Sequence, residues 1–415
     1  MEDNNQWLKT ALAKSEEKRN QHLLTLMQQC GVDHPDLIPG FVYIRHRPAM
    51  WIGDTGIPGF HHLFKEIFDN SIEEVMAGLC NQVLVTVHSD GSLSVRDNGR
   101  GIPLQHLRVV LTELHAGGKL PASRTYKIGG GLHGVGTSCV NALSEWMETT
   151  VWQAGRQVTV RTERGEIVEE REEAFEGQTG TRIRFKPDPQ IFGDSAWSPE
   201  RLLAIQRQQA FLNPKLTLTF TDESLGCDPQ VLNFPGGVAE WAREHAAARR
   251  PIHQRVIAGS GKKDDVEVDV AFYFTQEDPV WLAFGNGVQL GVMGTPGTPL
   301  TGFRQGVART LSKWAKKYGR EFEPRTAQAG VAVILSVRVY DPVFNGPMKD
   351  SLQNPEAASA VWAVTAMALE AHFTRFPDEA EAIVSGMLGD GSLEALRGKI
   401  KRRIRYWQAI KRTKF

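Results

Sequence analysis

A short run of residues from 61 to 70 sets three polar side chains four residues apart within an apolar pattern. Residues four apart lie side by side on a helix, so His62, Glu66 and Asn70 would project from one face. A carboxylate can orient or deprotonate an attacking water, and an amide oxygen can hold Mg²⁺ against phosphate oxygens. His62 could hold the Glu66 carboxylate by a hydrogen bond and tune its basicity. Taken alone, the spacing also fits the solvated polar face of an ordinary helix.

A second segment, RDNGRGIP at 96–103, places a carboxylate in a glycine-rich turn. Asp97 would end a strand there and could accept a hydrogen bond from an adenine amino group. Gly99 and Gly101 would let the backbone approach a flat heterocycle, and Pro103 would fix the chain beyond them. The alternative is an Asp-Asn-Gly turn that only closes a hairpin.

A third segment, KIGGGLHGVG at 127–136, formally matches the pattern G-x-G-x-x-G. No apolar strand leads into it, so a dinucleotide-binding fold is not indicated, and the Walker pattern is absent from the sequence. Bare N–H groups that lead into a helix N-terminus favour triphosphate oxygens, although a mobile linker is the alternative. Gly118 and Lys119 add a second glycine hinge with a cation, as in a lid that closes over a nucleotide.

The elements that must position these side chains can be predicted from periodicity. The polar row lies in a helix expected from His61 to Gly78, with a broad apolar face on its other side. Residues 82–101 predict a hairpin that delivers Asp97 into its turn, with Asp90-Gly91 as a tight type I′ connection. A helix is expected around Leu111. TSCVNALSEWM after the glycine loop predicts another helix, and further strands are expected at 149–152, 157–161 and 181–185.

Segregated helices and strands of this kind predict an α+β domain over residues 41–222, with a mainly antiparallel sheet backed by helices in two layers. A composition change near residues 221–229 marks the expected boundary, and residues 223–390 predict a smaller α/β domain. Its expected elements are helices at 237–247, 303–318 and 355–376 and strands at 266–274 and 330–339. Residues 1–40 predict a helical arm.

Bulk composition narrows the class of protein. Of the 415 residues, 41% are hydrophobic and 23% are charged, which is typical of a globular chain, and Lys+Arg and Asp+Glu both number 48. With no net charge, any attraction to nucleic acid must be local, and residues 391–415 form a basic tail that could contact phosphates or be a solvated terminal helix. The four cysteines contain no CxxC pair, so a zinc site or disulfide framework is not indicated. No membrane span or signal peptide is expected, and a cytoplasmic location follows by default.

At these residues the chain resembles the ATPase region of DNA gyrase B and its topoisomerase IV counterpart. Both belong to a superfamily with mismatch-repair ATPases, heat-shock chaperones and sensor histidine kinases. Four segments are specific to the topoisomerase branch: RHRPAMWIGD at 45–54, LHAGGK at 114–119, GGLHGVG at 130–136 and FNGPMKD at 344–350. The resemblance covers residues 40–385 and implies an ATPase domain followed by a transducer domain.

The resemblance implies roles for individual residues, with ATP and Mg²⁺ as cofactors. Glu66 becomes the general base, His62 its partner, and Lys349 the transducer lysine that reaches the γ-phosphate; without the family, Lys349 is only a loop lysine. Asn70 becomes the Mg²⁺ ligand and Asp97 the adenine anchor. The implied nucleotide-binding residues are Asn70, Glu74, Asp97, Arg100, Gly101, Pro103, Gly118, Lys119, Gly130, Gly131, Leu132, His133, Gly134, Val135, Gly136 and Thr181.

The sequence also departs from the family pattern. Pro347 stands where the family has a glutamine two places before Lys349, which would weaken or rearrange sensing of the γ-phosphate. Residues 295–300, TPGTPL, replace E-G-G-T-H-L, and Trp51 replaces the tyrosine of M-Y-I-G. The N-terminal arm has no recognisable nucleotide-contacting tyrosine. Turnover is therefore expected to be slow.

The expected function is an ATP-dependent dimerising clamp of a type IIA DNA topoisomerase. Two copies would close around double-stranded DNA when ATP binds. The E-G-D-S and D-x-D signatures of the cleavage domain are absent from this sequence, so cleavage would come from another domain or subunit. The alternative is a gyrase B-derived DNA-clamping ATPase with a non-topoisomerase partner in defence or repair. A chain that binds ATP without hydrolysing it is disfavoured because Glu66 is present.

Overall fold

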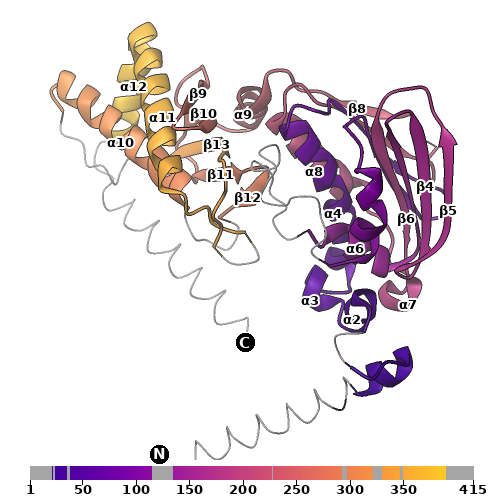
Figure 1. Ribbon diagram of the computed structural model, residues 1–415. Coiled ribbons are helices and arrows are strands. Elements are labelled where there is room, and N and C mark those ends of the chain that lie inside the picture. Colours follow the sequence, from indigo (N-terminus) through magenta and orange to yellow (C-terminus); the bar gives the residue numbers. More distant parts are fainter. Residues whose placement is uncertain are drawn as a thin grey trace, which may run out of the picture. The chain divides into compact units, whose positions relative to one another are not determined.

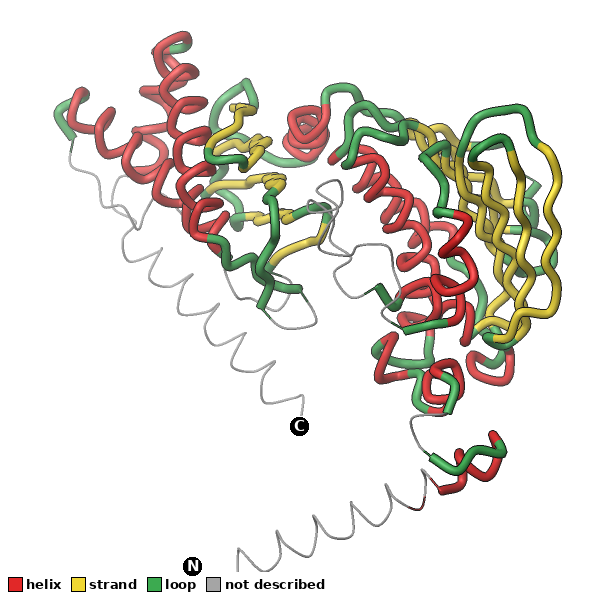
Figure 2. The backbone as a smooth tube through the Cα atoms, viewed as in Figure 1, coloured by secondary structure: helices red, strands yellow, loops and turns green. Residues whose placement is uncertain are grey.

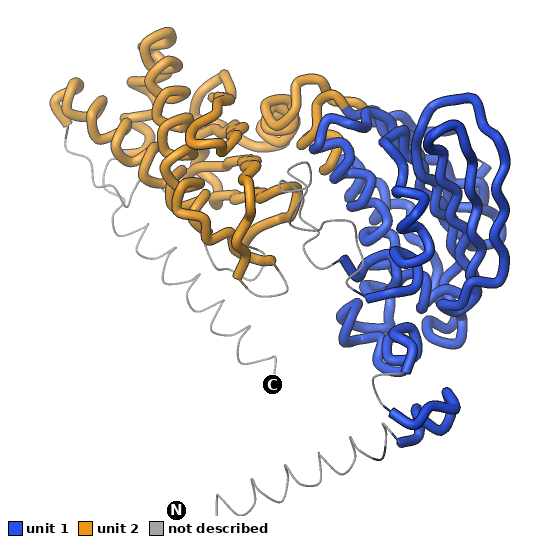
Figure 3. The backbone as a smooth tube through the Cα atoms, in the orientation of Figure 1, with its two compact units in different colours: residues 1–126, 131–207, 216–232 blue, residues 127–130, 208–215, 233–415 orange. Residues whose placement is uncertain are grey.

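The structure is a computed structural model that describes residues 21, 24–34, 38–114, 134–226, 228–291, 297–320, 330–345 and 349–388. Its backbone divides into two compact units (Figure 3). The first unit comprises residues 1–126, 131–207 and 216–232, and the second comprises residues 127–130, 208–215 and 233–415. Glu66, Asn70 and Asp97 belong to the first unit, whereas Lys349 belongs to the second.

The described part of the first unit contains an eight-stranded sheet in the order β5-β4-β3-β6-β2-β1-β7-β8 (Figure 1). Its strands are β1 (Gln82–Val87), β2 (Leu93–Asp97), β3 (Ser144–Gln153), β4 (Arg156–Glu163), β5 (Glu166–Ala174), β6 (Gly180–Pro187), β7 (Thr217–Asp222) and β8 (Gln230–Leu232). All neighbours pair antiparallel except β1 and β7, which are parallel. The mainly antiparallel sheet predicted from the sequence is confirmed.

Helices cover one face of this sheet, which gives the unit two layers (Figure 2). The helices described between residues 40 and 212 are α2 (Gly40–His46), α3 (Ala49–Ile52), α4 (Ile57–Met76), α5 (Leu107–Thr112), α6 (Gly136–Ala142), α7 (Pro189–Phe192) and α8 (Pro199–Leu212), the last five residues of α8 belonging to the second unit. The other face of the sheet carries half-exposed polar side chains at alternate positions of β4 and β6. The α+β fold class predicted from the sequence is confirmed.

The long helix α4 positions the polar row identified in the sequence. Pro58 lies in its first turn, where the missing N–H has no helical partner to lose. Gly78 follows its end at φ +74°, a backbone conformation that glycine adopts without strain. The side chains buried on its apolar face are Leu63, Phe64, Ile67, Phe68 and Ile72. Each such burial stabilises the fold by roughly 1.5–3 kcal/mol, which fixes the face left for the polar row.

Two local expectations were wrong. Residues 144–147, expected to extend a helix, form the start of β3, because pairing with β6 and β4 on both sides outweighs the weak helical preference of four residues. The turn between β1 and β2 is not type I′, since Asp90 does not have positive φ and only Gly91 does. The Asp90 carboxylate instead accepts hydrogen bonds from the Ser92 N–H at 3.0 Å and hydroxyl at 2.6 Å.

The second unit has a five-stranded sheet in the order β12-β11-β13-β10-β9, among the described residues. Its strands are β9 (Ile257–Lys263), β10 (Val266–Phe274), β11 (Val280–Gly285), β12 (Val288–Leu290) and β13 (Val331–Arg338). Its helices are α9 (Gly237–Ala247), α10 (Thr298–Lys317), α11 (Pro355–Arg375) and α12 (Pro377–Leu388). The predicted α/β character of this half is confirmed.

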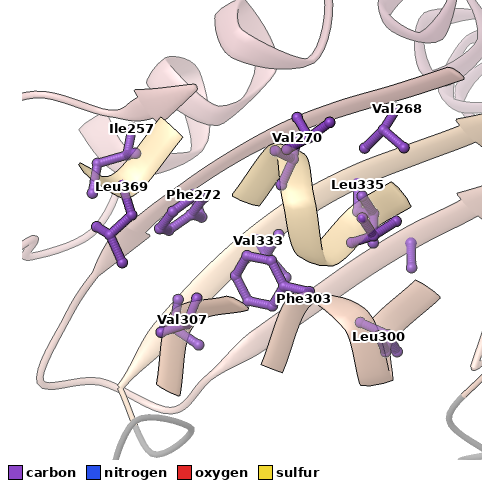
Figure 4. Close-up of a cluster of buried hydrophobic side chains, with 14 of the residues drawn as sticks. Ile257, Val268, Val270, Phe272, Leu300, Phe303, Val307, Val333, Leu335 and Leu369 are labelled. Atoms are coloured by element: carbon purple, nitrogen blue, oxygen red, sulfur yellow. The ribbon is translucent and has the colours of Figure 1, made fainter. Parts of the chain in front are cut away.

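Both faces of this second sheet are buried. Val270 and Phe272 of β10 pack with Phe303 of α10 in a large apolar cluster that includes residues of α11 and α12 (Figure 4). On the opposite face, Ala271 packs with residues of α9, such as Ala242. Successive side chains of a strand point to opposite faces of the sheet, so each strand contributes to two apolar cores. This explains the near-continuous apolar sequence of β10 and β13. No helix in the described part of the chain combines the length and apolarity that a membrane span needs.

Candidate active site

The structure brings His62 and Glu66 into contact on the polar face of α4. Nε2 of His62 lies 3.0 Å from Oε1 of Glu66, and each side chain is about one third exposed, at 35% and 33%. An ionised carboxylate can only accept a hydrogen bond, so this contact suits an imidazole with its proton on Nε2. The two side chains thus lie together on the helix face, as the sequence predicted.

Helix α6 begins beside Glu66 and Asn70. A Cβ atom at Gly136, its first residue, would collide with Oε2 of Glu66, so a larger residue there would displace the carboxylate from its present position. Nδ2 of Asn70 donates to the Thr137 hydroxyl at 3.1 Å, which fixes the rotation of the amide. The Asn70 and Glu66 oxygens are of the type that Mg²⁺ prefers, so the side chains present fit that ion.

Asp97 ends β2 as a buried carboxylate with an exposed fraction of 8%. Its Oδ1 accepts from the backbone N–H of Gly99 at 2.9 Å and of Thr181 at 3.3 Å. Its Oδ2 accepts from the Ser71 hydroxyl at 2.9 Å. Burial raises the pKa of Asp97 above its ordinary value, and these three hydrogen bonds oppose that rise. A further donor would offset more of the desolvation of this carboxylate.

Glu74 and Arg100 form an ion pair next to Asp97. Nε of Arg100 lies 3.3 Å from Oε1 of Glu74, and the backbone N–H of Arg100 donates to Oε2 at 3.3 Å. The Glu74 side chain is 12% exposed and that of Arg100 34% exposed. A Cβ at Gly99 would meet both Glu74 and Asp97 at close to 3 Å, so the glycine lets both carboxylates lie against the turn.

The turn after Asp97 is held from β3, which is separated from β2 by β6 in the sheet. Gly101 has φ +80°, and a Cβ there would lie 3.1 Å from the carbonyl oxygen of Trp152. Nε2 of Gln153 donates to the carbonyl of Arg100 at 3.0 Å, and its Oε1 accepts from the Leu104 N–H at 3.4 Å. Pro103 lies between these contacts at φ −55°. The turn is therefore part of the folded sheet rather than a free hairpin end.

Some predicted site residues lie outside the described residues: Gly118, Lys119, Gly130, Gly131, Leu132 and His133. Gly134 has φ +61°, and Val135 is the residue before α6. Lys349 has φ +53° and belongs to the second unit. The first unit thus brings together the predicted residues of α4, β2, β6 and the start of α6.

Sequence reasoning missed three residues of this site: Ser71, Thr137 and Gln153. Ser71 and Thr137 directly follow Asn70 and Gly136, and their hydroxyls hold the functional groups of Asp97 and Asn70. Small polar residues beside a candidate ligand are a signal that could have found them. Gln153 is 50 residues beyond Pro103, and only the pairing of β3 with β6 brings it to the turn.

Comparison with known proteins supports this fold. Residues 56–191 match the family model for histidine kinase-, DNA gyrase B- and HSP90-like ATPases. This match defines the class of the first unit as an ATPase of that superfamily. Residues 237–393 match the family model for DNA gyrase B.

Individual relatives show which family within this superfamily the chain resembles. The DNA gyrase B protein of Thermus thermophilus is 40% identical over 343 residues, which cover 78% of this chain and 53% of the relative. The DNA gyrase B protein of Thermotoga maritima is 34% identical over 411 residues, 93% of this chain and 64% of the relative. The 43K ATPase domain of T. thermophilus gyrase B, solved with an aminocoumarin, superposes with a TM-score of 0.71 at 34% identity, covering 89% of this chain and 98% of that one. The chain belongs to the DNA gyrase B family of ATPases, and it spans about half to two thirds of the length of these two curated relatives.

Proposed function

We propose that this chain binds ATP in its first unit and hydrolyses it with Glu66 as the general base. The observation that carries the proposal is that α4 joins the two parts of the site: Glu66 and Asn70 lie against the start of α6, 66 or more residues away in the sequence, and Ser71, next to Asn70, donates to Asp97 of β2. Nε2 of His62 lies 3.0 Å from Oε1 of Glu66 and can hold that carboxylate in place. The Glu66 carboxylate, which lies against Gly136, then takes a proton from water as that water attacks the γ-phosphorus and ADP leaves.

The adenine would be recognised by Asp97. A carboxylate offers about four lone-pair sites, and the hydrogen bonds from Gly99, Thr181 and Ser71 use three of them. The amino group of adenine is a donor that fits the remaining site. Glu74 and Arg100 would border the nucleotide where it enters, and Thr181 would lie near the base.

The phosphates would lie toward the start of α6. Gly134, Val135 and Gly136 would offer N–H groups to the phosphate oxygens, continued by residues 118–119 and 130–133 of the predicted lid. Asn70 would hold Mg²⁺, which neutralises charge on the phosphates when it is bound. Lys349 would stabilise the charge that develops on the γ-phosphate. Both roles follow from the resemblance to the family.

The broader role we propose is the ATP-operated gate of a type IIA DNA topoisomerase, with DNA held by a dimer and cleaved by another domain or subunit. Support comes from the gyrase B family model over residues 237–393 and from gyrase B relatives along most of the chain. A location in the cytoplasm goes with this role. The second candidate is a DNA clamp that works with a different partner. Supercoiling or relaxation of plasmid DNA, after the chain is supplied with cleavage subunits, would distinguish the two.

The test of the hydrolytic function is Glu66→Gln. The amide keeps the size of the side chain but cannot accept a proton, so phosphate release should fall by about 10²-fold or more, the scale of a lost general base. ATP affinity, measured by calorimetry, should change little because the adenine anchor is untouched. Lys65→Gln, at the preceding residue of α4, is the matched control and should hydrolyse ATP normally. Equal activity of Glu66→Gln and the wild type would remove Glu66 from this role.

A further inference from the structure

One segment specific to the family, RHRPAMWIGD at 45–54, has no part in the chemistry described so far. Its first residue, Arg45, lies in the last turn of α2 with its side chain 20% exposed. Nη1 of Arg45 donates to the carbonyl oxygen of Ala142 at 2.8 Å, and Nη2 donates to Oδ2 of Asp188 at 2.7 Å. The guanidinium therefore joins the far end of α6 to a buried carboxylate.

The carboxylate that Arg45 contacts is firmly held. The Asp188 side chain is 0% exposed, and it caps α7 by accepting from the Gln190 N–H at 3.0 Å. Arg164 donates from Nε to Oδ2 of the same carboxylate at 2.9 Å. Burial by itself would raise the pKa of Asp188, but the hydrogen bonds from Gln190, Arg45 and Arg164 bring it below its ordinary value. Asp188 is thus an ionised carboxylate in a fixed position, and its ion pair with Arg45 fixes the guanidinium.

Arg45 satisfies a group that the helix cannot satisfy itself. Ala142 is the last residue of α6, and the final carbonyls of a helix have no partner within the helix. The next carbonyl, of Leu143, accepts from the Asp188 N–H at 3.0 Å. Asp188 and its partner Arg45 therefore hold both carbonyls at the end of α6. Charge-assisted bonds of this kind are about twice as strong as neutral ones.

The opposite end of the same helix faces the hydrolytic side chains. Gly136 lies against Oε2 of Glu66, and Thr137 accepts the hydrogen bond from Asn70. Only seven residues form α6, so about 8 Å of rigid helix separates Thr137 from Ala142. A helix this short has no internal bend to absorb a displacement. A shift at its end is therefore passed to the positions of Glu66 and Asn70.

We propose that Arg45 is a positioning residue for ATP hydrolysis: it fixes α6 so that Gly136 and Thr137 set the orientation of Glu66 and Asn70. The inference rests on the proposed function of Glu66 and adds a residue that touches neither nucleotide nor water. Asp97 lies on β2 and has no bond to α6 among those described, so adenine binding does not depend on Arg45. Loss of Arg45 affects the chemical step and the Mg²⁺ requirement, and leaves base recognition in place.

Arg164 provides a matched control, because it shares the Asp188 carboxylate with Arg45 but has no hydrogen bond to α6 in the described structure. In the full chain, Arg45→Ala and Arg164→Ala should both lower the thermal unfolding temperature. Only Arg45→Ala should lower kcat, by about 10-fold to 10²-fold, the scale expected when a catalytic group is misplaced by about 1 Å. It should also raise the Mg²⁺ concentration for half-maximal rate, whereas affinity for ADP without Mg²⁺ stays within about twofold of wild type.

If Arg45→Ala does not fold, Arg45→Lys provides a second test of the positioning role. A lysine offers one compact charge and cannot hold both Ala142 and Asp188 in the fork geometry of arginine, so kcat should be intermediate. The inference is overturned if Arg45→Lys matches wild type in kcat and Mg²⁺ dependence, or if Arg164→Ala loses as much kcat as Arg45→Ala. Glu66→Gln separates the two proposals. If Glu66→Gln is inactive but Arg45→Ala is fully active, only the positioning role of Arg45 is contradicted. If Glu66→Gln is fully active, the general-base role of Glu66 and the positioning role of Arg45 are both contradicted.

Discussion

At the residue scale, the site depends on side chains held by neighbours that have no chemistry of their own. Ser71 orients Asp97, Thr137 orients Asn70, and His62 orients Glu66. Each functional group is therefore held by at least one polar neighbour. Such pre-organisation removes part of the entropy cost of assembling the reacting groups when the nucleotide binds.

Asp97 gives the residue-scale prediction. Asp97→Asn replaces a charged acceptor by an amide, so the hydrogen bond to an adenine amino group weakens or is lost. A hydrogen bond to a charged group is worth about 1.5–3 kcal/mol, so ATP affinity should fall roughly 10-fold to 10²-fold in calorimetry. Asp90→Asn, a carboxylate in the turn of the same hairpin, should leave ATP affinity unchanged. An Asp97→Asn chain that unfolds like wild type and still binds ATP normally would contradict the assignment.

At the element scale, the sequence predicts an element well where one pattern dominates it. The bounds of α9 and β10 agree with the expected 237–247 and 266–274, because the apolar periodicity of α9 and the β-branched residues of β10 each indicate one type of element. The edge strand β5 was not predicted, since EIVEEREEA is mostly exposed and lacks an alternating apolar pattern. It is held on one side by β4, through cross-strand ion pairs such as Arg156 with Glu172 at 3.0 Å. Pairing of this kind cannot be seen from one strand alone.

The candidate site shows the same limit. The polar row of α4 and the turn at Asp97 follow from local spacing, which a sequence displays directly. Gln153 reaches the turn only through strand pairing, and Arg45 reaches α6 only through packing of α2. Such contacts between distant segments depend on the assembled fold, so composition and periodicity do not predict them.

A buried polar cluster in the second unit joins the ends of two helices. Nε2 of His372 in α11 lies 3.1 Å from Oε2 of Glu379 in α12, and Nδ1 of His253 lies 3.4 Å from the same oxygen. Arg255 also pairs with Glu379. Nε2 of His253 accepts the Phe274 N–H at 3.0 Å, so the proton of its neutral ring is on Nδ1, where a metal ion would need a lone pair. In this tautomer Nδ1 has no lone pair for a metal ion, and the cluster is held by the His372–Glu379 hydrogen bond and by ion pairs with Glu379.

This cluster predicts acid sensitivity of the second unit. Burial lowers the pKa of His253 to about 4, and burial also lowers the pKa of His372. The unfolded chain takes up these protons near the ordinary histidine pKa of about 6.5, and the folded chain does so only at lower pH. Stability should thus be complete above about pH 6.5 and fall toward pH 4, by at most about 1.4 kcal/mol per pH unit for each histidine.

Urea unfolding at pH 7.5 and pH 5 measures this dependence. His253→Gln keeps an acceptor for the Phe274 N–H but does not titrate, so its stability should change less between the two pH values than that of wild type. His106→Gln, outside the cluster in the first unit, is the control and should follow wild type. An unchanged pH dependence in His253→Gln would show that the cluster does not titrate as described.

At the scale of the whole molecule, the family predicts a nucleotide-operated dimer. A ligand shifts an assembly equilibrium only if it binds the assembled state more tightly, and ATP would do so by ordering contacts that both copies share. Light scattering should therefore detect twice the monomer mass with a non-hydrolysable ATP analogue and Mg²⁺, and the monomer with neither. Glu66→Gln should still dimerise with the analogue, whereas Asp97→Asn should need more of it. A mass that does not respond to the analogue would count against the clamp.

The central claim is that α4, β2 and the start of α6 form one site for ATP. A crystal structure of the full chain with a non-hydrolysable ATP analogue and Mg²⁺ tests it most directly. The predicted result has the adenine amino group on the Asp97 carboxylate, the Asn70 oxygen on Mg²⁺, and a water between Glu66 and the γ-phosphorus. An analogue bound elsewhere, or bound with Glu66 and Asn70 turned away from its phosphates, would contradict the account.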